Sequence, residues 1–286
     1  MTQIRLEHVT YVYGKGTPFE KIALDDVSMT FEKGKITGLM GHTGSGKSTV
    51  AQLLNGLLKP DAGTVFLNEE DIWQDPKQMQ KIRTRVGLVF QYPEYQLFEE
   101  TVLKDIAYGP TNMGLDEEEI RRRVMQSAKF CGISGEMLSK SPFELSGGQK
   151  RRVAIAGIMA MEPEVLVLDE PAAGLDPRGR REILGGIRAY QEKTGKTMII
   201  ISHSMEDMAV YADRLAVLKN GKLIDHDTKE HVFANGEALV QMGLNVPQIT
   251  RVASGLADAG FDVPRSVFSV QQAYDAIIAL LEKKNR

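Results

Sequence analysis

The sequence predicts an α/β fold with a mostly parallel central sheet, an N-terminal antiparallel β subdomain, an inserted helical subdomain and a small C-terminal helical extension. Three observations support this prediction. Short, continuous apolar runs, typical of strands buried on both faces, recur along the chain. The first of them leads directly into a glycine-rich segment and then a helical pattern, and one long interval between two runs has little strand character.

The N-terminal segment alternates apolar and polar residues as antiparallel strands do. We expect strands at residues 4–9, 11–13 and 27–31, interrupted by a turn at Gly14, Gly16 and Pro18. The core strands are expected at residues 36–40, 86–90, 165–168, 198–201 and 215–218. Asn220-Gly221 then marks a hairpin near the end of the core.

Helical patterns fill the intervals between these strands. A helix over 48–58 is predicted by apolar residues at positions 50, 53, 54 and 57, which share one face. Asp116 and Glu119 have the spacing of a capping box, which predicts a helix through Cys131. We therefore expect an inserted helical subdomain at about 94–160, within a domain that spans residues 1–240.

Residues 241–286 form the predicted C-terminal extension. One helix follows Pro247, and a second follows Ser269. Their expected apolar faces comprise Ile249, Val252, Ala253 and Leu256 in the first helix and Tyr274, Ile277, Ile278 and Leu281 in the second. Three partners are open for these faces: each other, the core, or a second subunit across a dimer. We expect the extension to act in dimerisation.

Composition excludes some function classes. The 286 residues carry 35 Lys and Arg against 38 Asp and Glu, and this net charge of −3 argues against a general nucleic-acid binder. Cys131 is the only cysteine, so a disulfide within the chain and a thiolate metal cluster are both excluded. The N-terminal residues lack the apolar segment of a signal peptide, and the apolar runs are far shorter than the ~20 residues that span a bilayer. We expect any membrane role to depend on a partner.

A phosphate-binding motif lies between the first core strand and the helix after it. The pattern G-x-x-x-x-G-K-[ST] is met by Gly41, His42, Thr43, Gly44, Ser45, Gly46, Lys47 and Ser48, with Thr49 next in the helix. Glycines allow backbone amides to surround phosphate oxygens at the positive end of the helix. Lys47 is expected to reach the β- and γ-phosphates and Ser48 to ligate Mg²⁺. The motif predicts ATP and Mg²⁺ as cofactors.

Two further segments extend this chemistry. Residues 165–168 are apolar and lead into Asp169 and Glu170. Asp169 is expected to hold Mg²⁺ beside the phosphate loop, and Glu170 to polarise the attacking water as general base. A serine and two glycines open another predicted helix in the segment Leu145, Ser146, Gly147, Gly148 and Gln149, which offers a second phosphate-binding helix start.

These three motifs, in this order and spacing, resemble those of the ABC-type ATPases over roughly residues 1–235. The resemblance implies a P-loop NTPase (RecA-like) core in which the LSGGQ segment of one subunit covers the γ-phosphate held by the other. It also implies that Gln91 contacts Mg²⁺ and the attacking water, and that His203 steadies the γ-phosphate. By the same resemblance, Asp176 is expected to belong to a loop that crosses the dimer interface, and adenine is expected to stack on Tyr13, with Tyr11 as a nearby alternative.

A narrower resemblance is to the second ATPase of the energy-coupling factor transporters. It is carried by residues 90–98 and 101–110, by Pro142-Phe143-Glu144 and by residues 171–177. It implies an ATP-hydrolysing subunit on the cytoplasmic face of the cell membrane that powers uptake of a vitamin or similar micronutrient. The resemblance also implies the partners of the chain: a paralogous ATPase or a second copy of itself, a transmembrane coupling subunit and a substrate-binding membrane subunit. Nucleic acid is not among the expected partners.

Alternatives remain open at this point. Cobalt and nickel importers share much of the narrower pattern. ABC-type ATPases also act in DNA repair and on ribosomes, but those proteins carry long insertions or two tandem cores, and this core is single and uninterrupted. A coupling surface is expected at Glu94, Glu99, Glu100 and Asp105, where acids follow Gln91 and face arginines of the membrane subunit.

Overall fold

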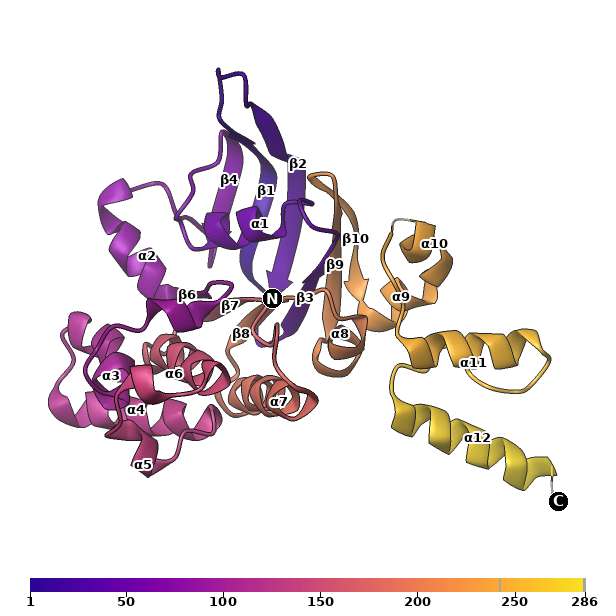
Figure 1. Cartoon of the computed structure of the whole chain (residues 1–286). Coiled ribbons are helices and arrows are strands. Elements are labelled where there is room, and N and C mark those ends of the chain that lie inside the picture. The colour runs from indigo at the N-terminus through magenta and orange to yellow at the C-terminus, as the bar shows by residue number, and fades with distance from the viewer. Residues whose placement is uncertain (242, 285–286) are drawn as a thin grey trace.

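The computed structural model describes residues 1–241 and 243–284, and at its centre lies a six-stranded sheet (Figure 1). The strand order is β10-β9-β3-β8-β7-β6. Its strands are β3 (Ile36–Met40), β6 (Val86–Val89), β7 (Val165–Asp169), β8 (Thr197–Ile201), β9 (Arg214–Lys219) and β10 (Lys222–Thr228). All are parallel except β10, which pairs with β9 as a hairpin through Asn220 and Gly221, both at positive φ. The five predicted core strands and the hairpin are confirmed.

A second sheet, antiparallel and four-stranded, covers one side of the core. Its order is β2-β1-β4-β5, formed by β1 (Thr2–Tyr13), β2 (Lys21–Glu32), β4 (Ala62–Leu67) and β5 (Glu70–Asp71). Residues 4–13 form one strand rather than the two predicted, because bulges around Val9 absorb the break in the apolar pattern without ending the pairing with β2. Strands β4 and β5 were not predicted from the sequence.

Helix α1 (Lys47–Leu54) lies between the two sheets. Its Val50, Leu53 and Leu54 are fully buried in a cluster with side chains from both sheets. The predicted end at residue 58 is wrong. Gly56 adopts φ +70 and its amide bonds the carbonyl of Leu53, which is the left-handed ending typical of helices that stop at glycine. Leu57 is consequently 39% exposed instead of facing the core.

The other face of the central sheet carries most of the remaining helices. A 3-10 turn at Pro76–Gln78 leads into α2 (Met79–Arg85). The inserted segment then holds α3 (Val102–Asn112), α4 (Glu117–Phe130), α5 (Gly135–Leu138) and α6 (Gly147–Ala160), with short 3-10 turns at Pro93–Gln96 and Pro142–Glu144. α7 (Pro177–Thr194) and α8 (Met205–Tyr211) follow between later strands. One hydrophobic cluster joins α3, α4, α6 and α7 to the sheet.

The predicted capping box on α4 is half formed. Asp116 accepts a hydrogen bond from the amide of Glu119 at 2.9 Å, as expected for an N-cap. The Glu119 carboxylate does not return to the N-cap backbone, because it instead pairs with Arg122 and Arg123 on the same helix. The helix begins where predicted, although only one of the two expected contacts holds it.

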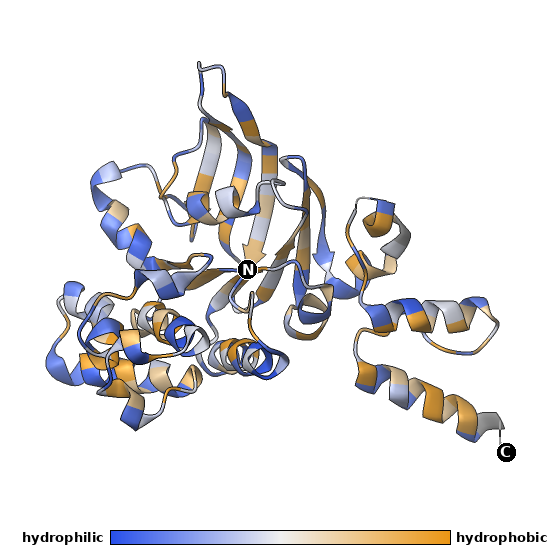
Figure 2. Cartoon of the chain, viewed as in Figure 1, coloured by the Kyte–Doolittle hydropathy of each residue, from blue (hydrophilic) through white to orange (hydrophobic). Residues whose placement is uncertain are grey.

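Of the four helices that the structure describes after β10, the first two still pack on the core and the last two extend away from it (Figure 1). They are α9 (Lys229–Ala234), α10 (Gly236–Gln241), α11 (Gln248–Asp258) and α12 (Val270–Lys284). α11 and α12 pack on each other in a small separate cluster centred on Ala253 and Ala273. Of the expected faces, Ile249, Ala253 and Leu256 take part in this cluster, whereas Val252, Tyr274 and Leu281 are about half exposed, so packing of the latter across a dimer stays a prediction. Hydrophobic residues occur along both of these helices (Figure 2).

Within the described residues, every helix is too short or too polar to cross a bilayer.

Candidate functional site

The loop between β3 and α1 has a backbone that only glycine can adopt at its two critical positions. Gly41 has φ +152 and Gly46 has φ +107. A Cβ on Gly41 would lie 2.3 Å from the carbonyl oxygen of Leu218, and one on Gly46 would lie 2.7 Å from that of Ala23. Both positions combine a disfavoured conformation with a close backbone approach, so the glycines of the motif are structural requirements of this turn.

Lys47 and Ser48 begin α1 and point back into the loop. The Lys47 Nζ donates to the carbonyls of Gly41 and His42 at 2.7 and 2.9 Å, and its side chain is nearly buried. Burial lowers the pKa of Lys47, and the carboxylates of Glu170 and Asp169 act in the opposite direction. Ser48 Oγ donates to Asp169 Oδ2 at 2.7 Å, which joins the loop to the end of β7.

The two acids after β7 occupy different environments. Asp169 ends the strand, whereas Glu170 adopts φ +51 and turns toward His203. Glu170 Oε1 lies 3.3 Å from His203 Nε2 without hydrogen-bond geometry, so this buried oxygen has no donor. Burial, reinforced by the charge of Asp169, raises the pKa of Glu170 to about 7. Such a carboxyl is poised to take up a proton near neutral pH.

His203 follows β8 and completes this end of the sheet. Burial and the charge of Lys47 lower its pKa, while Asp169 acts against them. The imidazole is therefore mostly neutral at pH 7 and can donate one hydrogen bond without adding a second cation beside Lys47.

A cavity of about 260 Å³ collects most of the predicted residues. From the phosphate loop it is lined by Thr43, Gly44, Gly46, Lys47, Ser48 and Thr49, and from the strand ends by Gln91, Asp169, Glu170 and His203. Tyr13 lines it too, with its hydroxyl 3.3 Å from Thr49 Oγ1, whereas Tyr11 packs on the core. This arrangement favours Tyr13 over Tyr11 as the adenine platform. The roles assigned to these residues stay predictions.

Three residues of the loop motif do not line the cavity. Gly41 and Ser45 lie beneath the loop, where Ser45 is fully buried. The His42 ring turns away, with Nε2 3.2 Å from Asn220 Oδ1. Conversely, sequence reasoning missed Lys21, Ala23 and Ile201, which line the cavity from β2 and β8. Lys21 is brought to the cavity by its pairing with Tyr13 across β1 and β2. This register cannot be read from the sequence.

The LSGGQ residues lie outside this cavity. Ser146 caps α6 by accepting from the amide of Gln149 at 3.4 Å, and the Gln149 side chain accepts from the amide of Ser146 at 2.9 Å. This reciprocal capping box uses neither the Gly147 nor the Gly148 amide. A Cβ on Gly147 would meet nothing within 4 Å. The structure therefore does not bring this helix start to the chain's own phosphate loop.

Asp176 also lies outside the cavity, where it caps α7. Its Oδ1 accepts from the amide of Gly179 at 2.6 Å, an ordinary N-cap contact. The neighbouring Leu175 packs 3.3 Å from the position that a Cβ on Gly148 would take, so the two segments are adjacent at the surface. The implied interface role of Asp176 stays a prediction.

The expected acidic coupling surface is wrong for two of its four members. Glu94 pairs with Arg151, and Asp105 accepts from the amides of Phe98 and Glu99 at 3.1 and 3.0 Å. Both carboxylates are thus committed within the chain. The other two members are not committed in this way: Glu99 lies next to these acids, and the Glu100 carboxylate forms a solvent-exposed ion pair with Lys104.

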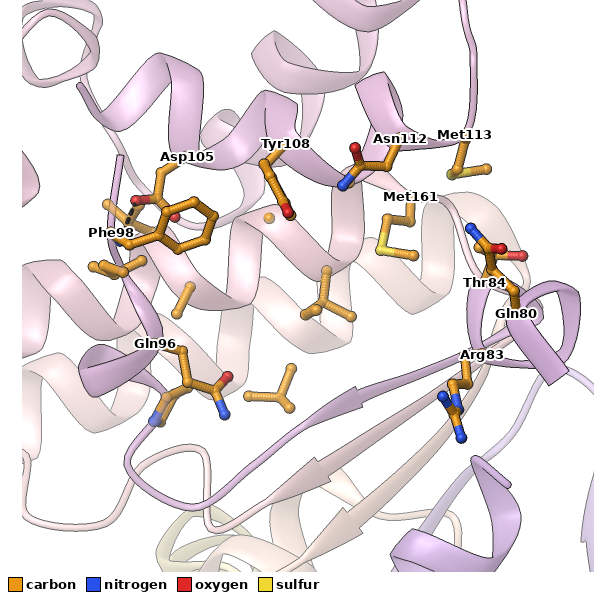
Figure 3. A pocket seen from close by; sticks show the side chains of 18 residues that line it. Gln80, Arg83, Thr84, Gln96, Phe98, Asp105, Tyr108, Asn112, Met113 and Met161 are labelled. Atoms are coloured by element: carbon orange, nitrogen blue, oxygen red, sulfur yellow. Dashed lines mark hydrogen bonds between the residues drawn. The ribbon is translucent and has the colours of Figure 1, made fainter. Parts of the chain in front are cut away.

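Beside these acids lies a hollow of about 680 Å³ between α2, α3 and α6 (Figure 3). Gln80, Arg83 and Thr84 lie at one end of it, and Phe98, Asp105 and Tyr108 lie at the other. The Phe98 and Tyr108 rings pack edge to face with their centroids 4.8 Å apart, and each side chain is about half exposed. Exposed aromatic rings around a groove are typical of protein-binding surfaces.

Comparisons with known proteins agree with this geometry. The ABC transporter family matches residues 24–173. The "Energy-coupling factor transporter ATP-binding protein EcfA2" of Caldanaerobacter subterraneus subsp. tengcongensis is 50% identical over 278 residues, covering 97% of each chain. The protein of the same name from Clostridium perfringens is 49% identical over 283 residues, covering 99% of each.

Solved structures show the same fold. cbiO1 from Clostridium perfringens, described as part of the ABC transporter complex cbiONQ, has a TM-score of 0.76 at 38% identity, covering 91% of this chain and 97% of its own. The ATP-binding cassette MJ0796, in a dimeric post-hydrolysis state bound to ADP and Pi, has a TM-score of 0.71 at 28% identity, covering 79% and 98%. With its phosphate loop, carboxylates and LSGGQ helix, this chain is an ATP-hydrolysing member of the ABC transporter family and belongs to the energy-coupling factor ATP-binding proteins.

Proposed function

We propose that two such subunits, this chain with a second copy or with a paralogue, enclose ATP between the phosphate loop of one and the LSGGQ helix of the other. The observation that carries the proposal is the position of the α6 start. Gly147 and Gly148 lie outside the chain's own cavity, and Gly147 faces open space. Their unused amides and the positive end of α6 supply donors for a phosphate that another molecule holds.

Within one chain, the phosphate loop and Lys47 bind the β- and γ-phosphates. Ser48 and Asp169 are already joined by a hydrogen bond at the cavity wall, and with Gln91 they offer hydroxyl, carboxylate and amide oxygens, the donors that Mg²⁺ prefers. The described residues contain no group of three or more acidic, His or Cys side chains able to hold a metal alone. This donor set fits a Mg²⁺ that shares its coordination with nucleotide phosphates, whose charge the ion neutralises.

Glu170 then acts as the general base. Its buried Oε1 has no hydrogen-bond partner among the described residues, so it can accept a hydrogen bond from the attacking water. Because the pKa of Glu170 is raised to about 7, the carboxylate accepts a proton from this water readily as it attacks the γ-phosphate. Neutral His203, which follows β8, donates to the γ-phosphate oxygens. Gln91, which follows β6, orients the water.

The groove beside α3 and α6 is the docking site for a transmembrane coupling subunit. Its exposed rings suit an apolar helix of that partner, and Glu99 and Glu100 at its edge suit basic residues flanking such a helix. This contact would hold the chain as a peripheral protein at the cytoplasmic face of the membrane. The transported solute, a vitamin or similar micronutrient, is selected by a separate substrate-binding membrane subunit.

The C-terminal extension, residues 241–286, contributes to pairing of the two ATPases. After α11 and α12 pack on each other, Val252, Tyr274 and Leu281 still expose about half or more of their surface. An apolar face left uncovered beside a folded pair of helices is suited to a second subunit.

Sedimentation of the Glu170→Gln variant tests the two-chain site. With ATP and Mg²⁺, and with the paralogue present if it is required, this variant is expected to form a stable closed pair, because ATP stays bound when hydrolysis is slow. Adding Gly147→Asp should abolish pairing by placing a carboxylate against the phosphate, while Gly147→Ala should leave it intact. Wild-type turnover per subunit should also fall on dilution. A specific activity that does not change on dilution would contradict the proposal.

A further inference from the structure

Arg151 is a guanidinium buried inside the protein, only 3% exposed, one turn into α6. Its Nε and Nη2 donate to the two carboxylate oxygens of Glu94 at 3.0 and 2.7 Å, which is the bidentate arrangement. Its Nη1 donates to the carbonyl of Ala173. Burial is the largest single influence on the pKa of Glu94 and raises it, but the hydrogen bond from Arg151, a backbone hydrogen bond and the Arg151 charge together leave the net pKa lowered.

This single side chain joins three segments that are distant in sequence. Glu94 lies in the turn after Gln91, and the ring of Tyr92 in the same turn lies 5.9 Å from the Arg151 guanidinium. Ala173 belongs to the segment that leads from Glu170 to Asp176. Arg151 itself belongs to the helix that begins with the LSGGQ glycines. The contacts therefore connect a wall of the ATP cavity, the second phosphate-binding helix start and the segment between them.

Residues next to both members of the pair in the sequence line the groove described above. Pro93, Gln96 and Leu97 line the groove from the turn that carries Glu94. Val153, Ala154 and Gly157 line it from α6, directly after Arg151. A partner seated in the groove thus touches both elements that the ion pair holds together.

The Arg151–Glu94 pair differs in kind from the ion pairs nearby. Lys104–Glu100 and Arg178–Glu182 have exposed partners, and such pairs hold little structure because water competes for both charges. A buried bidentate pair is intolerant of change, because removal of one partner leaves a charge without compensation and lysine cannot reproduce the fork of donors.

We propose that Arg151, acting through Glu94 and the Ala173 carbonyl, is a positioning residue that makes the turn after Gln91 and the LSGGQ helix move as one body when a partner occupies the groove. This inference rests on the proposed function for the identity of the partner in the groove. The rigid connection itself is a property of the single chain, and it is testable there.

The first test uses the isolated full-length chain. Arg151→Met should raise hydrogen–deuterium exchange of amides in residues 92–98 and 171–176 by about tenfold or more, because both segments lose their shared anchor. Glu94→Gln should raise exchange in the first segment more than in the second. The control Arg178→Ala removes an arginine whose side chain is 83% exposed, and it should leave both segments unchanged. Unchanged exchange in Arg151→Met would overturn the proposal.

The second test uses the complete transporter in lipid vesicles. Arg151→Lys, a milder change in case Arg151→Met folds poorly, should reduce the stimulation of ATPase by the membrane subunits about fivefold or more, with the KM for ATP altered less than about twofold. Glu94→Gln combined with Arg151→Lys should be no worse than the more severe single variant, because both break one unit.

The outcomes separate this proposal from the proposed function. Additive effects of the two substitutions, or an equal loss of basal and stimulated rates, would overturn the role of the pair. A wild-type chain that no membrane subunit stimulates would refute the proposed function, and the exchange measurement would then still decide whether Arg151 anchors the three segments.

Discussion

Two helices in this protein begin at glycine-rich segments, and their first turns are constructed in opposite ways. Helix α1 follows Gly46 at φ +107, has no side-chain cap, and buries Lys47 and Thr49 at its start. Helix α6 follows Ser146 in an extended conformation and has a complete capping box with Gln149. One start is enclosed by the chain and uncapped, while the other is capped and faces outward.

The difference indicates how each helix start meets an anion. The uncapped amides of α1 lie in the cavity formed by the same chain, so this site is assembled before ATP arrives. The box on α6 stabilises the helix by itself and leaves the amides of Gly147 and Gly148 unused. The start of α6 is therefore stable in a single chain, but it meets an anion only when another molecule supplies one.

The same substitution at the two helix starts should give the largest contrast. Gly46→Ala forces a strained backbone and a contact with the carbonyl of Ala23, so we expect a loss of about 2–4 kcal/mol in unfolding free energy and loss of ATP binding. Gly147→Ala should stay within about 1 kcal/mol of wild type. Urea unfolding measures the loss of stability in both variants, and nucleotide titration measures their ATP binding. Similar losses in Gly46→Ala and Gly147→Ala would refute the difference between the two helix starts.

Glu170→Gln is expected to sharpen the comparison on the catalytic side. Turnover should fall about 100-fold or more because the general base is lost, while ATP affinity remains near that of wild type. Glu206→Gln, at an exposed position on α8, is the matched control and should retain full activity. A Glu170→Gln variant with nearly normal ATPase would rule out the base role.

The raised pKa of Glu170 gives this variant a second, pH-dependent effect. The folded protein binds a proton at Glu170 more tightly than the unfolded chain, so this group makes stability fall as pH rises from about 4.5 to about 7. Glu170→Gln removes that penalty. The variant should be more stable than wild type by about 1–3 kcal/mol at pH 8, with the difference shrinking toward pH 5. Unfolding free energies at these two pH values test the prediction.

The wild-type rate should follow the same titration. The kcat/KM for ATP is expected to rise with pH through about 7 as Glu170 loses its proton. The residual rate of Glu170→Gln should lack this rise. A wild-type profile that is flat between pH 6 and 8 would contradict a base with this pKa.

The contrast between the two helix starts also marks the reach of sequence reasoning. The positions of the five core strands along the chain could be predicted because each buried strand is a continuous apolar run. The phosphate-loop side of the site could be predicted because its residues are contiguous in the sequence. What depends on pairing between distant segments was missed: Lys21 enters the cavity through its register with Tyr13, and Glu94 is bound by Arg151. The sequence also left open what the apolar residues of α12 pack against, because Ala273 faces α11 while Tyr274 and Leu281 are about half exposed.

The smallest expected effect concerns the cap of α6. Ser146→Ala removes the acceptor for the Gln149 amide but leaves the bond from the Ser146 backbone to the Gln149 side chain, so half of the box survives. We expect a loss of about 1 kcal/mol in unfolding free energy. ATP binding by the isolated chain should not change, because Ser146 lies outside its cavity. ATP-dependent pairing should weaken, since the amides that meet the second molecule are held less firmly. If ATP binding by the isolated chain weakened as much as pairing, the two helix starts would share one site, and the difference between them would no longer explain why two molecules are needed.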